Sequence, residues 1–189
     1  SAWNQNIFPF YFVQIAPYTY SGSNNSESAF LREAQLKTML ESKNSGMVVT
    51  LDIGNEFSIH PEEKVIIGKR LAYWALAKDY NIMGIPYSGP IYKSIEIKEN
   101  KIVVDFDYSG YGFIFFNGKI NGFEIAGKDK VFYPATVNVM YGENVSKLTV
   151  YSEKVKEPIA VRYGWKNYLK GNLYNIEGLP ASSFRSDNW

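Results

Sequence analysis

Two short apolar runs near the start of the chain constrain its fold more than any other feature of the sequence. Residues 10–16 and 47–52 are almost continuously apolar, whereas a half-exposed strand would alternate apolar and polar side chains. Such runs are typical of strands that are buried on both faces. The first run is followed by Pro17 and a polar loop over 21–26. We therefore expect both runs to be strands in the interior of a sheet.

A helix-length stretch follows each run. Residues 27–41 are rich in Ala, Leu, Glu, Gln and Lys, which favour helix, and an Asn-Ser-Gly sequence at 44–46 gives a stop signal. Pro61 suits the first turn of a second helix, which we expect to run through residue 77 or 78. The order strand, helix, strand, helix therefore predicts an α/β part with three layers, in which helices cover both faces of a parallel sheet.

The pattern changes at the Tyr-Ser-Gly-Pro sequence over 87–90. Beyond it, short runs rich in Val, Ile, Thr and Phe alternate with turn signals at intervals of roughly 8–12 residues, which predicts an antiparallel β-sandwich. We place the boundary between an α/β domain over 1–90 and a sandwich domain over 91–189. The tail over 172–189 is expected to be irregular but packed. The expected strands cover residues 95–97, 102–106, 113–116, 123–126, 136–139, 148–151 and 159–163.

The composition argues against several classes of function. Twenty Lys and Arg against nineteen Asp and Glu give a net charge of +1, without the basic excess typical of nucleic-acid or anionic-membrane binding. There is no cysteine, no calcium-loop spacing and no glycine-rich phosphate loop. No apolar run approaches the roughly 20 residues that span a bilayer. We therefore expect no metal, cofactor, nucleic acid or membrane partner, while the 15 Tyr, 12 Phe and 4 Trp favour ligands such as sugars.

The only histidine, His60, lies after the second expected strand and directly before Pro61. In open α/β sheets, functional groups gather at the carboxyl ends of the strands. A neutral imidazole at that place could take a proton from a hydroxyl nucleophile during acyl transfer. The alternative is a solvent-exposed histidine at the start of a helix. No Gly-x-Ser-x-Gly sequence accompanies it in the chain.

A series of motifs resembles, in order, those of the sialate O-acetylesterases, a branch of the SGNH-type carbohydrate esterases. The matching sequences cover residues 8–17, 31–35, 50–54, 59–61, 87–90, 160–165, 172–175 and 178–185. The resemblance corresponds to the C-terminal part of such an enzyme, which implies a partial parallel-sheet SGNH-like half followed by an antiparallel β-sandwich domain. It also implies hydrolysis of O-acetyl esters on sialic acid or a related acetylated sugar, by a periplasmic or secreted enzyme.

The resemblance assigns roles to several residues. The Ile-His-Pro motif of the family carries the catalytic histidine, which corresponds to His60. Relatives often have an Asp two residues before that histidine and another three residues earlier, where this chain has Ser58 and Asn55. Ser58, Glu56 or a main-chain oxygen is then left to orient the imidazole. Arg32 is a candidate ligand for the carboxylate of a sialic acid, with an arginine on the surface or paired within its helix as the alternative.

The resemblance also shows what this chain lacks. The nucleophile of the family belongs to a Gly-Gln-Ser-Asn-like segment, and neither that segment nor the glycine and asparagine of the oxyanion hole has a match here. The chain alone is therefore expected to be inactive. Its sheet would keep an open apolar edge at 10–16 or 47–52, which predicts self-association or pairing with an N-terminal half. The alternative function is a non-catalytic module whose β domain binds carbohydrate or supports its neighbour.

Overall fold

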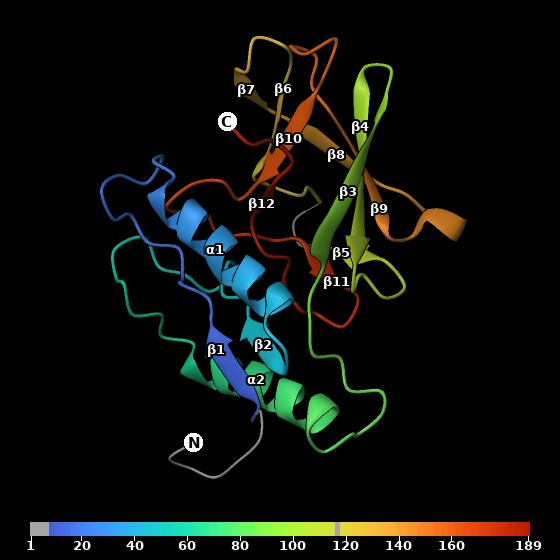
Figure 1. Ribbon diagram of the computed structural model, residues 1–189. Helices are drawn as coiled ribbons and strands as arrows, with labels where there is room; N and C mark the ends of the chain where they lie inside the picture. The colour runs from blue at the N-terminus through green and yellow to red at the C-terminus, as the bar shows by residue number, and fades with distance from the viewer. Residues whose placement is uncertain (1–7, 116–117) are drawn as a thin grey trace.

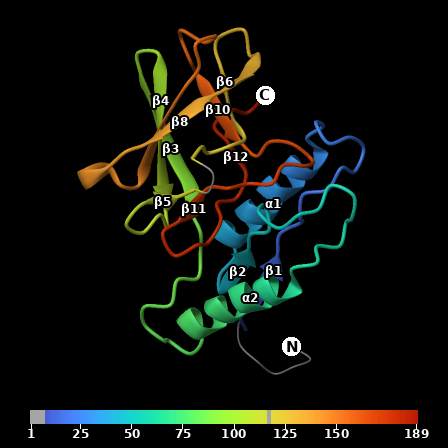
Figure 2. The same ribbon diagram turned by 180° about the vertical axis from the view of Figure 1, so that it is seen from behind.

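The computed structural model describes residues 8–115 and 118–189. Its N-terminal part is a two-stranded parallel sheet with a helix on each face (Figures 1 and 2). Strand β1 (Phe10–Val13) pairs with β2 (Ser45–Val48), and α1 (Glu27–Glu41) connects them. Helix α2 (Lys64–Lys78) follows β2. The predicted order of elements, the parallel pairing and both bounds of the first helix are thus confirmed.

Some boundaries differ from the prediction. Strand β2 begins at Ser45, before the expected run, because Asn44 already turns the chain with a φ of 54°. It ends at Val48, so the second half of the apolar run lies in a turn. Helix α2 begins at Lys64, while Pro61 is buried in the loop that precedes it. Strand β1 is half-exposed and not buried on both faces, since no described strand covers its outer edge.

Helix α1 buries one stripe of side chains, whose members include Arg32, Leu36 and Met39. Their spacing of three or four residues puts them on one face of a helix. Its first turn is capped by a residue far along the chain, since the main-chain N–H of Ser28 donates to Oδ1 of Asn167 at 2.9 Å. The helix thus depends on the C-terminal part of the chain for its N-terminal cap.

Gly46 in β2 allows α2 to approach the sheet closely. A Cβ at this position would lie 2.5 Å from the ring of Trp74 and 2.9 Å from Tyr11. The Trp74 ring is held in place because its indole N–H donates to the main-chain oxygen of Met47 at 3.1 Å. We expect Gly46→Ala to destabilise the protein by about 1–3 kcal/mol in urea unfolding, since the ring or the helix must shift.

The matched control for this substitution is Gly68→Ala in α2, where a Cβ would meet no atom within 4 Å. Because alanine favours helix over glycine, Gly68→Ala should raise stability by up to about 1 kcal/mol. Equal urea midpoints for Gly46→Ala and the parent protein would contradict the close approach of α2 to β2.

The second part of the molecule contains two four-stranded antiparallel sheets, in the orders β12-β10-β6-β7 and β3-β4-β9-β8, and a short pair of strands, β5 and β11. This confirms the antiparallel β-rich part. Of the expected strand over 113–116, β5 covers the first two residues, and residue 116 lies outside the described residues. The strands are β3 (Ile91–Lys98), β4 (Lys101–Asp107), β5 (Phe113–Ile114), β6 (Phe123–Ala126), β7 (Phe132–Pro134), β8 (Thr136–Val139), β9 (Lys147–Tyr151), β10 (Ala160–Tyr163), β11 (Tyr174–Asn175) and β12 (Phe184–Arg185), with a short 3-10 helix over Gly142–Asn144.

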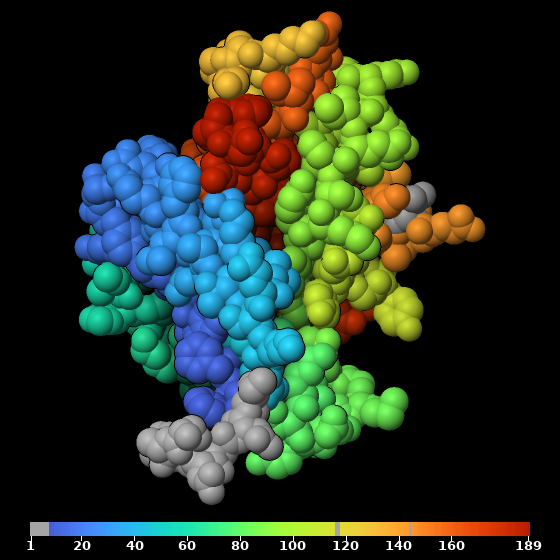
Figure 3. All heavy atoms as spheres, in the orientation of Figure 1, coloured from blue at the N-terminus to red at the C-terminus, as the bar shows by residue number. Residues whose placement is uncertain are grey.

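The two parts share one interior. Leu51, from the turn after β2, belongs to the same buried cluster as Ile102, Ile125 and Phe184 of the sheets. The tail is packed, as expected, but it also supplies strands β11 and β12 and is therefore less irregular than predicted. Figure 3 shows this C-terminal segment, in red, between α1, in blue, and the green β3–β4 region. Buried residues from both sides of residue 90 pack together. The domain boundary that we placed at residue 90 therefore remains a prediction.

Neither helix in the described part of the chain has the length and apolar character that crossing a membrane requires.

Candidate active site

A buried ion pair anchors the loop that follows β2. Arg70 of α2 donates two hydrogen bonds to the Asp52 carboxylate, from Nη1 to Oδ1 at 2.9 Å and from Nη2 to Oδ2 at 2.6 Å. Nη1 also donates to the main-chain oxygen of Val49 at 2.9 Å. Burial and the neighbouring Asp52 charge raise the pKa of Tyr174 to about 12, so its phenol stays neutral beside this pair. The two-pronged contact fixes where the loop leaves the sheet.

The loops that leave the carboxyl ends of the two parallel strands lie against each other. The Oγ1 hydroxyl of Thr19, after β1, donates to the main-chain oxygen of Glu56, after β2, at 2.7 Å. Gly54 packs on Pro17 so closely that a Cβ there would come within 2.4 Å of the proline carbonyl oxygen. These contacts place the loop before α2 at the carboxyl edge of the sheet, where ligands gather in open α/β folds.

His60 lies at the end of this loop with its side chain exposed. The main-chain N–H of His60 donates to Oγ of Ser58 at 3.3 Å, and the same hydroxyl donates to the main-chain oxygen of His60 at 3.3 Å. Oδ1 of Asn55 accepts from the N–H groups of Phe57 and Ser58 at 2.8 and 3.2 Å. The loop is thus shaped by its own side chains, and the imidazole is left accessible for proton transfer.

The structure does not bring the two predicted orienting side chains onto the imidazole. Ser58 uses its hydroxyl for the backbone of His60, which gives it a role in the turn. Glu56 is fixed through its main-chain oxygen, and its carboxylate has no hydrogen bond among residues 8–115 and 118–189. In those same ranges the imidazole has no hydrogen-bond partner either.

Arg32 has a different position from the one expected for a sugar ligand. Its side chain is completely buried under the C-terminal part of the chain. It donates to Oγ of Ser28 and Ser183 at 3.0 Å each, and to the main-chain oxygens of Gly164 and Lys166 at 3.1 and 2.5 Å. Burial lowers the pKa of this guanidinium to about 10. We therefore correct its role from substrate binding to packing, because no face of it is open to a carboxylate.

The loop also exposes apolar side chains on both sides of Ser58. Phe57 is 88% exposed and Ile59 is 49% exposed. Exposing large apolar side chains to water costs free energy, and a patch of them often marks a binding site for another molecule. The accessible imidazole therefore has an apolar border.

Sequence reasoning missed the residues that hold the loop, namely Asp52, Arg70 and Thr19. Asp52 at the end of an apolar run was a usable signal, because a carboxylate there needs a partner in the interior. Its partner on the helix and the loop contact of Thr19 depend on tertiary packing, which the local pattern does not encode. Within the described ranges, no three His, Cys, Asp or Glu side chains are grouped so as to hold a metal ion.

Comparison with known proteins gives an informative similarity among the solved structures. No protein-family model and no curated protein matches the chain. Among solved structures, a carbohydrate acetylesterase from Xanthomonas citri is 38% identical to it, with a TM-score of 0.87. The similarity covers 96% of this chain and 41% of that protein. The chain thus spans less than half the length of the acetylesterase that it resembles.

This chain therefore resembles the Xanthomonas citri protein in sequence as well as in fold, and the resemblance covers almost the whole chain.

Proposed function

We propose that this chain is part of a sialate O-acetylesterase in which His60 is the general base. The observation that carries the proposal is an exposed imidazole on a loop pinned to the carboxyl edge of a parallel sheet, in a chain similar to a carbohydrate acetylesterase. Among the described residues this imidazole has no hydrogen-bond partner. That position suits proton transfer with a hydroxyl held by neighbouring loops. An SGNH-like arrangement of the first half belongs to the same proposal.

In the reaction that we propose, a serine from polypeptide outside this chain attacks the acetyl carbonyl carbon. His60 takes the serine proton and then gives it to the sugar oxygen as the C–O ester bond breaks. This leaves an acetyl-serine and a free sugar hydroxyl. Water then attacks the acetyl-serine, again with His60 as base, and acetate leaves while the serine regains its proton.

The outer edge of β1 is where we propose that this polypeptide joins the sheet. Because Phe10, Phe12 and Gln14 bond to β2, the N–H and C=O groups of Tyr11 and Val13 point away from it, and they have no partner in the described ranges. The far edge of β2 is different, since Trp74 and Arg70 donate to its outward carbonyls. Of the two edges predicted to be open, β1 is thus the one available for a new strand.

The open edge leads to a prediction about the isolated chain. An unpaired apolar edge tends to pair with another chain, so residues 1–189 alone are expected to self-associate. Sedimentation at increasing concentration measures this. A stable monomer at high concentration would contradict an edge that requires a partner strand.

We further propose that the carboxylate of Glu56 orients the imidazole once the complete site is assembled, since it lies on the same pinned loop. Glu56→Gln in the complete enzyme is then expected to lower kcat at least about tenfold with little change in KM. Glu62→Gln changes an exposed carboxylate directly after Pro61, so it is the control and should leave kcat unchanged. An unchanged kcat for Glu56→Gln would assign the orienting role to a main-chain oxygen.

The proposed function is tested by acetate release from 9-O-acetylated sialic acid by the complete protein. An O-acetylated neutral sugar is the comparison substrate. Release from the sialic acid at the higher kcat/KM supports sialate as the substrate, and release only from the neutral sugar would leave an acetylesterase of different specificity. We also propose a periplasmic or secreted location, which cell fractionation of the source organism tests.

A further inference from the structure

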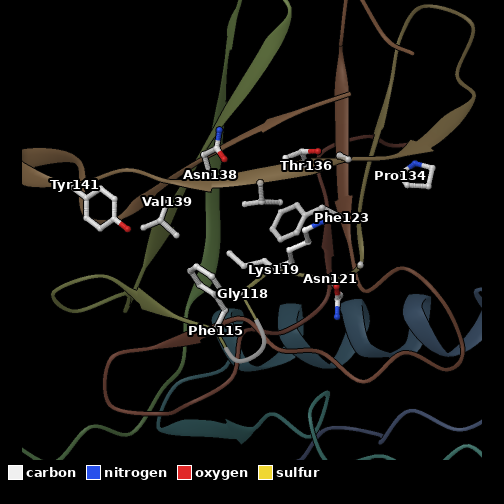
Figure 4. A pocket seen from close by; sticks show the side chains of 14 residues that line it. Phe115, Gly118, Lys119, Asn121, Phe123, Pro134, Thr136, Asn138, Val139 and Tyr141 are labelled. Carbon is white, nitrogen blue, oxygen red and sulfur yellow. The ribbon is translucent and has the colours of Figure 1, made fainter. Parts of the chain in front are cut away.

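A hollow of about 670 Å³ lies in the β-rich part, between β8 and residues 118–122, which precede β6 (Figure 4). Its size is within the usual range of small-molecule sites. A smaller hollow of about 160 Å³ adjoins it, and the two share Gly122, Phe123 and Pro134. The pair of hollows therefore offers space for a ligand with more than one unit.

The walls of the larger hollow combine apolar and aromatic side chains with polar ones. Along β8, Val137 and Val139 are half-buried toward it, while the alternate residues are exposed. Figure 4 shows Val139, Phe115 and Phe123 around the hollow, with Tyr141 at its side. Tyr141 is 81% exposed. Such walls suit the C–H face of a pyranose ring.

The main chain of β8 adds hydrogen-bonding groups at the rim. β8 is an edge strand, and Met140 N–H donates to Lys147 O at 3.2 Å, so by alternation the N–H and C=O groups of Val137 and Val139 point away from β9. None of these four groups has a partner in the described part of the chain. A ligand in the hollow would find both donors and acceptors there.

Lys119 carries the only charge among the described residues that line the larger hollow. Its ammonium is exposed, and no carboxylate in the described ranges forms an ion pair with it. The wall beneath it is rigid, because Asn172 donates to the Lys119 carbonyl at 2.7 Å and accepts from the N–H of Asn121 at 2.9 Å. A cation with no paired carboxylate among the described residues favours a negatively charged ligand.

We propose that this hollow binds an acidic sugar, a pyranose that carries a carboxylate, as one unit of a glycan. The carboxylate pairs with Lys119, the ring lies on the apolar wall, and hydroxyls bond to the free main-chain groups of β8. The choice of a sugar over other organic anions rests on the proposed function. The site is separate from the loop of His60, so it would hold the glycan while another unit is deacetylated.

Binding to the complete protein tests this site. The probe is the unacetylated methyl glycoside of sialic acid, with methyl glucoside as the neutral probe, and saturation-transfer NMR gives the Kd. Lys119→Gln is expected to weaken binding of the acidic probe about tenfold and to leave the neutral probe unaffected. Lys98→Gln, an exposed lysine in β3, is the matched control and should change neither.

Equal Kd values for Lys119→Gln and the parent protein would overturn the proposal, and so would equal binding of the two probes or no binding of either. Hydrolysis of 4-nitrophenyl acetate is measured on the same samples. Lys119→Gln should leave that hydrolysis intact, whereas His60→Gln should remove it and leave the binding. Failure of the proposed function and failure of this site therefore give different results.

Discussion

Replacing His60 with glutamine in the complete enzyme is expected to lower kcat for ester hydrolysis by about 10⁴-fold or more. Glutamine keeps the size and polarity of the side chain but cannot accept and return a proton. The fold should be unaffected, because His60 is exposed and its described hydrogen bonds use only main-chain atoms.

Two further measurements separate loss of the base from loss of structure. The urea midpoint of His60→Gln should equal that of the parent enzyme. In His60→Ala, added imidazole should restore part of the activity, because the side chain that it replaces is open to solvent. A kcat within about tenfold of the parent value for His60→Gln would contradict the proposed role of this residue.

The largest expected effect on stability comes from Arg70→Leu. The substitution leaves the buried Asp52 carboxylate without its cation, and it removes the hydrogen bond to the Val49 carbonyl. Removing one partner of a buried ion pair lowers the free energy of unfolding by about 3–5 kcal/mol. Urea unfolding of the variant and the parent protein measures the difference. Because Asp52 anchors the loop of His60, we also expect kcat to fall at temperatures where the variant is still folded.

Two control variants test whether the unpaired, buried Asp52 carboxylate causes this loss of stability. Lys93→Leu removes one side of the exposed Lys93–Asp107 pair and should cost less than about 1 kcal/mol. The double variant Asp52→Leu with Arg70→Leu should be more stable than Arg70→Leu alone, because no unpaired charge remains buried. A loss of stability in Arg70→Leu no greater than in Lys93→Leu would show that the buried pair does not anchor the loop.

The sequence predicted the elements whose signals are local. Helix α1 has the predicted bounds because its composition and the following turn act within a few residues. Strands β6 and β8 also have the predicted bounds, since turn signals flank both. The start of α2 was placed too early, because a proline that suits a first helical turn also suits the loop before it.

Arg32 shows what local reasoning leaves out. The sequence left open a sugar ligand, a surface arginine and an arginine paired within its helix, whereas the side chain is buried and donates to four oxygen acceptors. Three of them come from residues 164–183, far along the chain, and no local pattern indicates that this segment covers α1. His60 stays a predicted site residue; a lone histidine after a parallel strand is a local signal, whereas the contacts that pin its loop are not.

The most direct test of the account is a crystal structure of the complete enzyme, in which the distance between the His60 imidazole and the nearest serine hydroxyl is measured. We expect a ring nitrogen of His60 to lie within hydrogen-bond reach of a serine Oγ from outside this chain, about 2.6–3.2 Å away or slightly more without substrate. We also expect the strand that leads to this serine to pair with β1. A ring that faces away from the carboxyl edge of the sheet, with no serine hydroxyl near it, would contradict the account.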